Sequence, residues 1–234
     1  MTDHDYARCI DRLDRLITTF RDDFAKYRRR SPVARLADVF ESVSLQAGSK
    51  FKYSAASNDC GGREMKAARE MIRYAGLADR VRHRVGQGIP LGAQVKPKRF
   101  KILPFDIGIH QRVLGMDIPQ HLTASPTELA HRGSLAEVFV GLELIASGNP
   151  ARQPQLYYWH REAASSSAEV DYLIQRNTGV VPLESKAGRR GQMQSMYQFL
   201  DLHAQSSHGI RLSVENFSCH ARVQVMPLYN AAKF

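Results

Sequence analysis

Asp171 and Glu184 are two carboxylates whose positions suit metal-dependent chemistry. They lie in two short apolar runs, 168–175 and 180–187, and the turn-forming residues 176–179 between the runs predict a β-hairpin. A loop of even length places Asp171 directly opposite Glu184 on one face, because alternate strand residues share a face. Directly opposed carboxylates lie roughly 4.5–5.5 Å apart at Cβ, where like charges destabilise a sheet.

Such a pair persists if solvent screens it, if one carboxylate binds a proton, or if a cation lies between the two. A hard divalent cation is the chemically productive choice, because its preferred ligands are carboxylate oxygens. We therefore expect Asp171 and Glu184 to be metal ligands, with Mg²⁺ or Mn²⁺ as the cofactor. A bound ion of this kind polarises a phosphoryl oxygen and lowers the pKa of a bound water, which is the chemistry of phosphodiester hydrolysis.

Lys186 follows Glu184 by two residues and is expected on the same face. An ammonium group there positions the attacking water or stabilises developing negative charge. The same register places Glu169 opposite Lys186, so the alternative is an ordinary cross-strand ion pair, with Asp171 and Glu184 facing water. Pro182 leaves the register open, because proline often marks an edge or a bulge, and a bulge would make the two acids diagonal neighbours.

Glu137 is a third carboxylate, and a predicted helix carries it. Apolar residues recur around it at helical spacing, and residues 148–150 form a stop signal. The elements expected after this helix are a strand at 155–160, strands at 168–175 and 180–186, a helix at 190–204 and a strand at 209–214. The expected order is therefore αβββαβ.

With its acids and lysine on these elements, the segment resembles the PD-(D/E)XK nuclease superfamily. In this resemblance Glu137 matches the acid of the first helix, Asp171 the acid of the second strand, and Glu184 with Lys186 the pair on the third strand. The resemblance implies a catalytic role for Lys186, a role for Glu137 as an auxiliary ligand or supporting acid, and metal binding by Asp171 and Glu184. Ser185 stands where relatives more often carry an aliphatic residue, and its side chain is expected to point away from the site.

The stretches 132–137, 157–162 and 169–174 also resemble a family of prokaryotic AAA+-type ATPases that carry a C-terminal domain of unknown function with this nuclease-like fold. In that family an ATPase module comes first. These residues contain no Gly-x-x-x-x-Gly-Lys-Ser/Thr phosphate loop, so we expect no nucleotide cofactor and no ATPase activity. The resemblance implies a natural short form served by a partner protein in place of the ATPase module, or a decayed gene or remnant.

Composition suits two modest domains. The 234 residues are 43% hydrophobic and 24% charged, enough for real cores. Three cysteines, Cys9, Cys60 and Cys219, lack metal-ligand spacing and favour a reducing compartment. The sequence shows no signal pattern and no long uncharged apolar run, so the expected location is cytoplasmic, with no membrane partner.

Basic residues are concentrated in one segment. The formal net charge is +10, and residues 50–101 hold 13 basic against 4 acidic residues. A field of this sign attracts phosphates and is typical of nucleic-acid binding, so we expect a nucleic-acid partner, DNA in the first instance.

This segment also has the outline of a winged-helix domain. Helices are expected at about 5–29, 32–48 and 62–75, followed by hairpin strands at 78–85 and 99–105. In such a domain the third helix enters the major groove and the wing touches phosphates. The expected nucleic-acid contacts are Arg63, Lys66, Arg69 and Arg73 on the third helix, and Arg82, Arg84, Lys96 and Lys98 on the hairpin. The alternatives are a solvated basic helix face and a protein-docking module.

The sequence therefore predicts an α/β (α+β) protein of four parts. These are an N-terminal helix at 1–30, a winged-helix-like domain at 31–116, a linker at 117–126 and a PD-(D/E)XK restriction-endonuclease-like domain at 127–234. Two functions are consistent with it: a DNA-associated, metal-dependent nuclease, and a non-catalytic DNA- or protein-binding module that keeps the fold as a scaffold.

Overall fold

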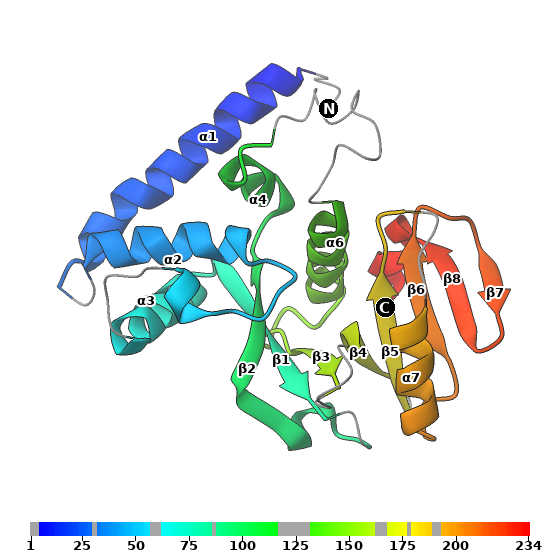
Figure 1. Ribbon diagram of the computed structural model, residues 1–234. Coiled ribbons are helices and arrows are strands. Elements are labelled where there is room, and N and C mark those ends of the chain that lie inside the picture. The colour runs from blue at the N-terminus through cyan, green and yellow to red at the C-terminus, as the bar shows by residue number, and fades with distance from the viewer. Residues whose placement is uncertain are drawn as a thin grey trace. The chain divides into compact units, whose positions relative to one another are not determined.

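The structure is a computed structural model that forms two compact units (Figure 1). The first unit contains Met1–Asp79 and Ile102–Ala130, and the second contains Arg80–Lys101 and His131–Phe234. The residues that the structure describes are 5–29, 32–56, 62–85, 88–116, 132–161, 168–176, 179–188 and 193–234. The linker expected at 117–126 lies outside them.

Helices make up most of the first unit, and the first three lie where the sequence predicts them, whereas α4 was not predicted. They are α1 (Tyr6–Asp23), α2 (Val33–Leu45), α3 (Gly62–Tyr74) and α4 (Ile107–Val113), with 3-10 turns at Phe24–Tyr27 and Tyr53–Ala55. The carboxylate of Asp5 caps α1 by accepting a hydrogen bond of 3.1 Å from the Arg8 N–H. Gly76, at φ +75°, takes the left-handed conformation that ends α3.

Aromatic residues organise the core of the first unit. The ring of Phe40 lies 5.8 Å from that of Phe24 and 6.3 Å from that of Phe20, both in tilted or edge-on geometry. A pocket of about 460 Å³ lies beside them, and Tyr27 and Tyr74 also line it. The helices of this unit are therefore held by an ordinary apolar core.

The second unit is built on a mixed eight-stranded sheet in the order β2-β1-β3-β4-β5-β6-β8-β7 (Figure 1). Its strands are β1 (Ala78–Arg84), β2 (Val95–Pro104), β3 (Leu156–His160), β4 (Glu169–Arg176), β5 (Gly179–Ser185), β6 (Gly209–Ser213), β7 (Ser218–His220) and β8 (Val223–Pro227). Helices α6 (Arg132–Ala146) and α7 (Gln194–Leu202) accompany the sheet, and a 3-10 helix spans Leu228–Lys233. The α/β class is confirmed, and the expected αβββαβ order forms the middle of the unit. Strands β7 and β8 extend it beyond the prediction.

The basic hairpin lies elsewhere than expected. We predicted it as a wing of the domain at 31–116, but β1 pairs in parallel with β3, from Val81 opposite Leu156 to Arg84 opposite Trp159. Residues 80–101 therefore belong to the second unit. The physical reason is burial on both faces of the strand, since Val81, His83 and Arg84 are all at most 1% exposed. A solvent-facing wing would expose at least one of these faces.

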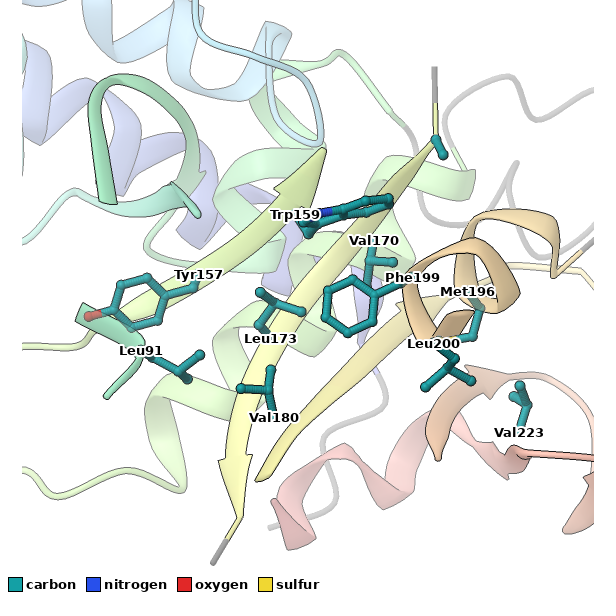
Figure 2. Packing of buried hydrophobic residues seen from close by; sticks show 11 residues of the cluster. Leu91, Tyr157, Trp159, Val170, Leu173, Val180, Met196, Phe199, Leu200 and Val223 are labelled. Atoms are coloured by element: carbon teal, nitrogen blue, oxygen red, sulfur yellow. The ribbon is translucent and has the colours of Figure 1, made fainter. Parts of the chain in front are cut away.

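Helix α7 packs on one face of the sheet (Figure 2). Its buried residues Met196, Phe199 and Leu200 lie against a cluster that the sheet and the β1–β2 connection supply: Leu91, Tyr157, Trp159, Ala168, Val170, Leu173, Val180 and Val223. The ring of Phe199 lies 5.3 Å from Trp159, edge-on, and stacks at 4.1 Å on His203. This apolar cluster fixes α7 and the middle strands.

Helix α6 covers the opposite face. The Tyr172 hydroxyl donates a 2.8 Å hydrogen bond to the backbone carbonyl of Glu137 on α6, whereas the next residue, Leu173, packs in the cluster under α7. Adjacent strand residues point to opposite faces, so α6 and α7 lie on different sides of β4. Within the described chain, no helix combines the length and apolar character needed to cross a bilayer.

Candidate functional site

The hairpin of β4 and β5 has the predicted register. Tyr172 pairs with Leu183, and the pairing continues without a shift to Arg176 opposite Gly179. Pro182 sits within this ladder, opposite Leu173, in a strand that has neighbours on both sides. The alternative of an edge or a bulge at Pro182 does not hold in this pairing, although the ladder stops before it reaches Asp171 and Glu184.

An irregularity lies instead between β3 and β4. Tyr157 pairs with Leu173 and Trp159 with Val170, so two steps along β3 correspond to three along β4. The extra residue places Asp171 and Tyr172 together opposite Tyr158, which is the geometry of a β-bulge. Bulges re-aim side chains, and here simple alternation fails at the position of the candidate metal ligand.

The expectation that the four charged hairpin residues share one face is wrong, because Glu184 and its partner Lys186 lie on the opposite face from Glu169. Val180 packs in the α7 cluster, and Glu184 follows it by four residues in a regular strand, so it points to the same face. The neighbouring strand agrees: Glu184 pairs with Arg211, and a side chain at Gly209, two residues earlier, would meet Met196 of α7. Glu169 lies on the α6 face, where it pairs with Lys101, the lysine that also pairs with Glu137.

Asp171 bridges the open end of the hairpin. Its Oδ2 accepts hydrogen bonds of 2.8 Å from both the backbone N–H and the hydroxyl of Ser185. Because the ladder ends at Leu183, the Ser185 N–H has no strand partner in β4 and takes the carboxylate instead. Ser185 was expected to point away from the site, and its hydroxyl is in fact bound to Asp171.

On the α6 face, Lys101 forms the centre of a buried cluster. Its Nζ lies 2.8 Å from Glu137 Oε1 and 2.5 Å from Glu169 Oε1, and 5.2 Å from the centre of the Tyr158 ring. The lysine is fully buried and Glu137 is 7% exposed. Sequence reasoning missed Lys101 because the hairpin was assigned to a wing. The available signal was a single lysine between apolar neighbours in the run 100–104.

The charged groups of this cluster shift one another's pKa values. Burial lowers the pKa of Lys101, but the carboxylates of Glu137, Asp171 and Glu169 outweigh it, and the pKa lies well above its ordinary value. Burial raises the pKa of Glu137 to about 7 despite the neighbouring ammonium of Lys101. Burial, together with the charges of Glu137 and Asp171, raises the pKa of the Tyr172 phenol. Lys101 therefore stays charged, while Glu137 can hold a proton near neutral pH.

On the α7 face, Glu184 and Lys186 form a second group. Lys186 Nζ lies 2.6 Å from Glu184 Oε1, and Glu169 pairs with Lys101, so the alternative of a cross-strand pair between Glu169 and Lys186 is wrong. Burial raises the pKa of Glu184 against the opposing effect of Lys186. Burial lowers the pKa of Lys186, but Glu184 reverses the shift and the pKa ends above its ordinary value.

One oxygen in this group stands out. Glu184 is 3% exposed, and its buried Oε2 has no hydrogen-bond partner among the described residues. A buried carboxylate oxygen normally has a donor or a cation beside it, because leaving it unpaired costs free energy. The Asp171 carboxylate raises the pKa of Glu184 further, although the bulge turns Asp171 toward the face of Tyr158 and Glu184 lies on the α7 face.

This donor set fits one divalent cation with few protein ligands. Mg²⁺ commonly keeps several waters and takes one or two carboxylates, which Asp171 and Glu184 supply. No group of three or more His, Cys, Asp or Glu side chains in the described parts of the chain converges closely enough to hold a metal. Three of the four acids are instead paired with a lysine, Glu137 and Glu169 with Lys101 and Glu184 with Lys186.

The basic residues of α3 divide by burial. Arg63 and Lys66 are exposed, as expected. Arg69 is 3% exposed and pairs with Glu70, while Arg73 is half-buried and donates to Glu70 at 2.9 Å. The expectation of a surface contact is therefore corrected for Arg69, whose guanidinium is held inside the unit.

The hairpin residues divide in the same way. Arg84 is fully buried and donates to the carbonyls of Gly88 and, at 3.3 Å, of Pro90. Arg82 and Lys96 are half-buried, and Lys98 is exposed. Arg84 therefore shapes the β1–β2 connection rather than the surface. Since α3 and the hairpin belong to different units, the predicted basic contacts do not form one domain's face.

The second unit is thus a mixed α/β domain with acidic side chains and lysines at the open end of one hairpin. Residues 2–120 match a domain of unknown function, DUF8612, and residues 132–231 match another, DUF4143. The first match covers just over half of the chain, which therefore belongs to the DUF8612 family. DUF4143 domains are commonly found with AAA ATPases, in agreement with the resemblance at this coarser level. No curated protein and no solved structure matches the chain significantly.

Proposed function

We propose that the second unit is a nuclease-like domain that hydrolyses phosphodiesters in DNA with the help of one Mg²⁺ or Mn²⁺. The observation that carries the proposal is the unpartnered, buried Oε2 of Glu184 next to Asp171 and Lys186. Two acids and one amine at the end of a hairpin are the groups that such chemistry needs.

Asp171 and Glu184 would hold the ion. When bound, the ion supplies a polarised phosphoryl oxygen and a water of lowered pKa. The chain's own residues set the geometry: Ser185 fixes one oxygen of Asp171, and burial fixes Glu184. Lys186 is about one-third exposed, so its ammonium can reach a substrate phosphate and stabilise the charge that develops there.

The exposed basic residues Arg63 and Lys66 support the nucleic-acid part of the proposal, since side chains of this kind contact phosphates. The association of DUF4143 domains with AAA ATPases supports an ATPase as the partner protein. In that arrangement a separate chain would supply nucleotide hydrolysis.

A second candidate function is a non-catalytic DNA- or protein-binding module. Its specific support is that Glu137, Glu169 and Glu184 each have a lysine partner already. Lysines that neutralise the acids permanently would leave the fold as a scaffold.

Metal titration and cleavage assays on the same variants separate the two functions. Mn²⁺ binding is measured by calorimetry, and cleavage of single- and double-stranded DNA and RNA is measured with and without EDTA. Asp171→Ala is expected to lose both metal and turnover, and Lys186→Ala to lose turnover while it keeps the metal, because lysine is not a ligand. Glu137→Ala is expected to lower metal affinity or turnover by about 10- to 100-fold.

The matched control is Asp201→Asn, which removes an exposed carboxylate of α7 away from the site and is expected to change nothing. Cleavage that is equal in every variant indicates a contaminating nuclease. If the wild-type chain binds no metal and cuts no substrate, the binding module becomes the better proposal.

A further inference from the structure

Lys101 is surrounded in the manner of a bound cation. An ammonium group has three N–H donors. Glu137 Oε1 and Glu169 Oε1 lie within hydrogen-bond distance of it, at 2.8 Å and 2.5 Å, and the group lies 5.2 Å from the centre of the Tyr158 ring. Asp171 adds a third negative charge that acts on the same ammonium.

The three acids come from separate parts of the second unit and converge only on this lysine. Glu137 lies on α6, while Glu169 and Asp171 lie on β4, on either side of Val170. The bulge turns Asp171 and Tyr172 together toward the face of Tyr158, so a regular strand would not bring all three acids to it. Removal of the lysine would leave the carboxylates of Glu137 and Glu169 without the cation between them.

The distances in the cluster suit an ammonium group and are too long for a bound Mg²⁺. The oxygens stand 2.5–2.8 Å from Nζ, whereas Mg²⁺ demands oxygens at about 2.0–2.1 Å. The tether of the lysine side chain also keeps the charge in place without any dependence on ion concentration. The ammonium therefore balances the acids and holds them apart.

We propose that Lys101 is a positioning residue whose ammonium occupies the place that a second divalent cation would take between Glu137 and Glu169. The inference rests on the proposed function in one respect, since it limits that site to a single metal ion, at Asp171 and Glu184. Enzymes with two metals place the ions about 3.5–4 Å apart. In this chain the second positive charge is carried by the Lys101 side chain and not by a bound ion.

The test counts divalent ions in Lys101→Ala, which opens space for an ion and its waters. Mn²⁺ per chain is measured by calorimetry and by electron paramagnetic resonance. Lys101→Ala is expected to bind one more Mn²⁺ than the wild type. The double variant Lys101→Ala/Glu169→Gln, which removes an acid together with the lysine, is expected to show no gain. Lys98→Ala, an exposed lysine of the same strand, is the matched control.

The difference between variant and wild type tests the inference, and wild-type binding itself tests the proposed function. One ion in the wild type, lost in Asp171→Ala, with no gain in folded Lys101→Ala, keeps the function and overturns the inference. No ion in the wild type, with one ion in Lys101→Ala, overturns the proposed function and supports the inference. Two ions in the wild type also overturn the inference.

A folding measurement replaces the ion count if Lys101→Ala does not fold in EDTA. Circular dichroism is then followed during a Mn²⁺ titration. Recovery of the wild-type spectrum with Mn²⁺ supports a cation site at Glu137 and Glu169. A chain that stays unfolded at saturating Mn²⁺ overturns it.

Discussion

The two units differ in how far both partners of an ion pair are buried. In the first unit Arg21 and Glu41 meet at 2.7 Å with nearly half of each side chain exposed, and the buried Arg69 pairs with the half-buried Glu70. In the second unit Lys101 and its partners are enclosed between α6 and the sheet. Exposed pairs contribute about 0–1 kcal/mol, whereas buried charges are costly to desolvate and add little net stability. A gain in stability therefore explains the buried cluster poorly, and the second unit is the better candidate for a functional site.

The largest expected effect follows from breaking the buried cluster. Lys101→Met leaves the buried Glu137 and the half-buried Glu169 without their counter-charge, and the free energy of unfolding is expected to fall by about 3–5 kcal/mol. Lys98→Met, in the same strand but exposed, is expected to change it by less than about 0.5 kcal/mol. Urea unfolding in EDTA measures both. Similar small losses in the two variants would mean that the buried lysine matters no more to stability than an exposed lysine of the same strand.

The second prediction concerns the pH dependence of stability. The pKa of Glu137 is about 7 in the folded chain and near its ordinary value of 4.5 in the unfolded chain. The folded state therefore binds this proton more tightly, so the contribution of Glu137 is fully present below about pH 4.5 and is lost as pH rises to about 7. The slope is at most about 1.4 kcal/mol per pH unit for one proton.

Glu137→Gln removes the carboxyl group that binds this proton. Its stability relative to the wild type is expected to rise between about pH 4.5 and 7 and to stay level above that range. Thermal or urea unfolding of both proteins across this range gives the difference. Parallel pH profiles for the two proteins would mean that Glu137 does not titrate with a raised pKa.

A third prediction sharpens the assignment of Glu184 to the α7 face. A methyl group at Gly209 would meet the Met196 side chain, which must move, so Gly209→Ala is expected to cost about 1–3 kcal/mol. Gly62→Ala is the control in the first unit, because no atom lies near the new methyl group. A free energy of unfolding unchanged in Gly209→Ala would remove one of the supports for this face.

The smallest expected effect on stability comes from the surface of α3. Arg63→Ala/Lys66→Ala is expected to change the free energy of unfolding by less than about 0.5 kcal/mol. If both residues contact DNA phosphates, the slope of log affinity against log salt falls by about 1.8. Fluorescence anisotropy with duplex DNA at several salt concentrations measures the slope. An unaltered slope would exclude these two residues from the interface.

The elements of both units were predictable because their signals are local. Helical spacing gave α1, α2, α3, α6 and α7, and the turn between two apolar runs gave the register of β4 and β5. The strands β7 and β8 were not predicted, and β7 spans only Ser218–His220. The place of β1 and β2 in the larger sheet depends on pairing with β3, far along the chain, and no local pattern encodes that contact.

The sequence by itself determined which residues could do chemistry and on which elements they lie. Side-chain type and the periods of helix and strand are properties of neighbouring residues, so they can be read in order. Only the tertiary structure decided which charge faces which. The bulge at Asp171 and the arrival of Lys101 between Glu137 and Glu169 depend on contacts between distant segments. In a buried site those contacts set each group's solvation, and with it the charge that the group carries.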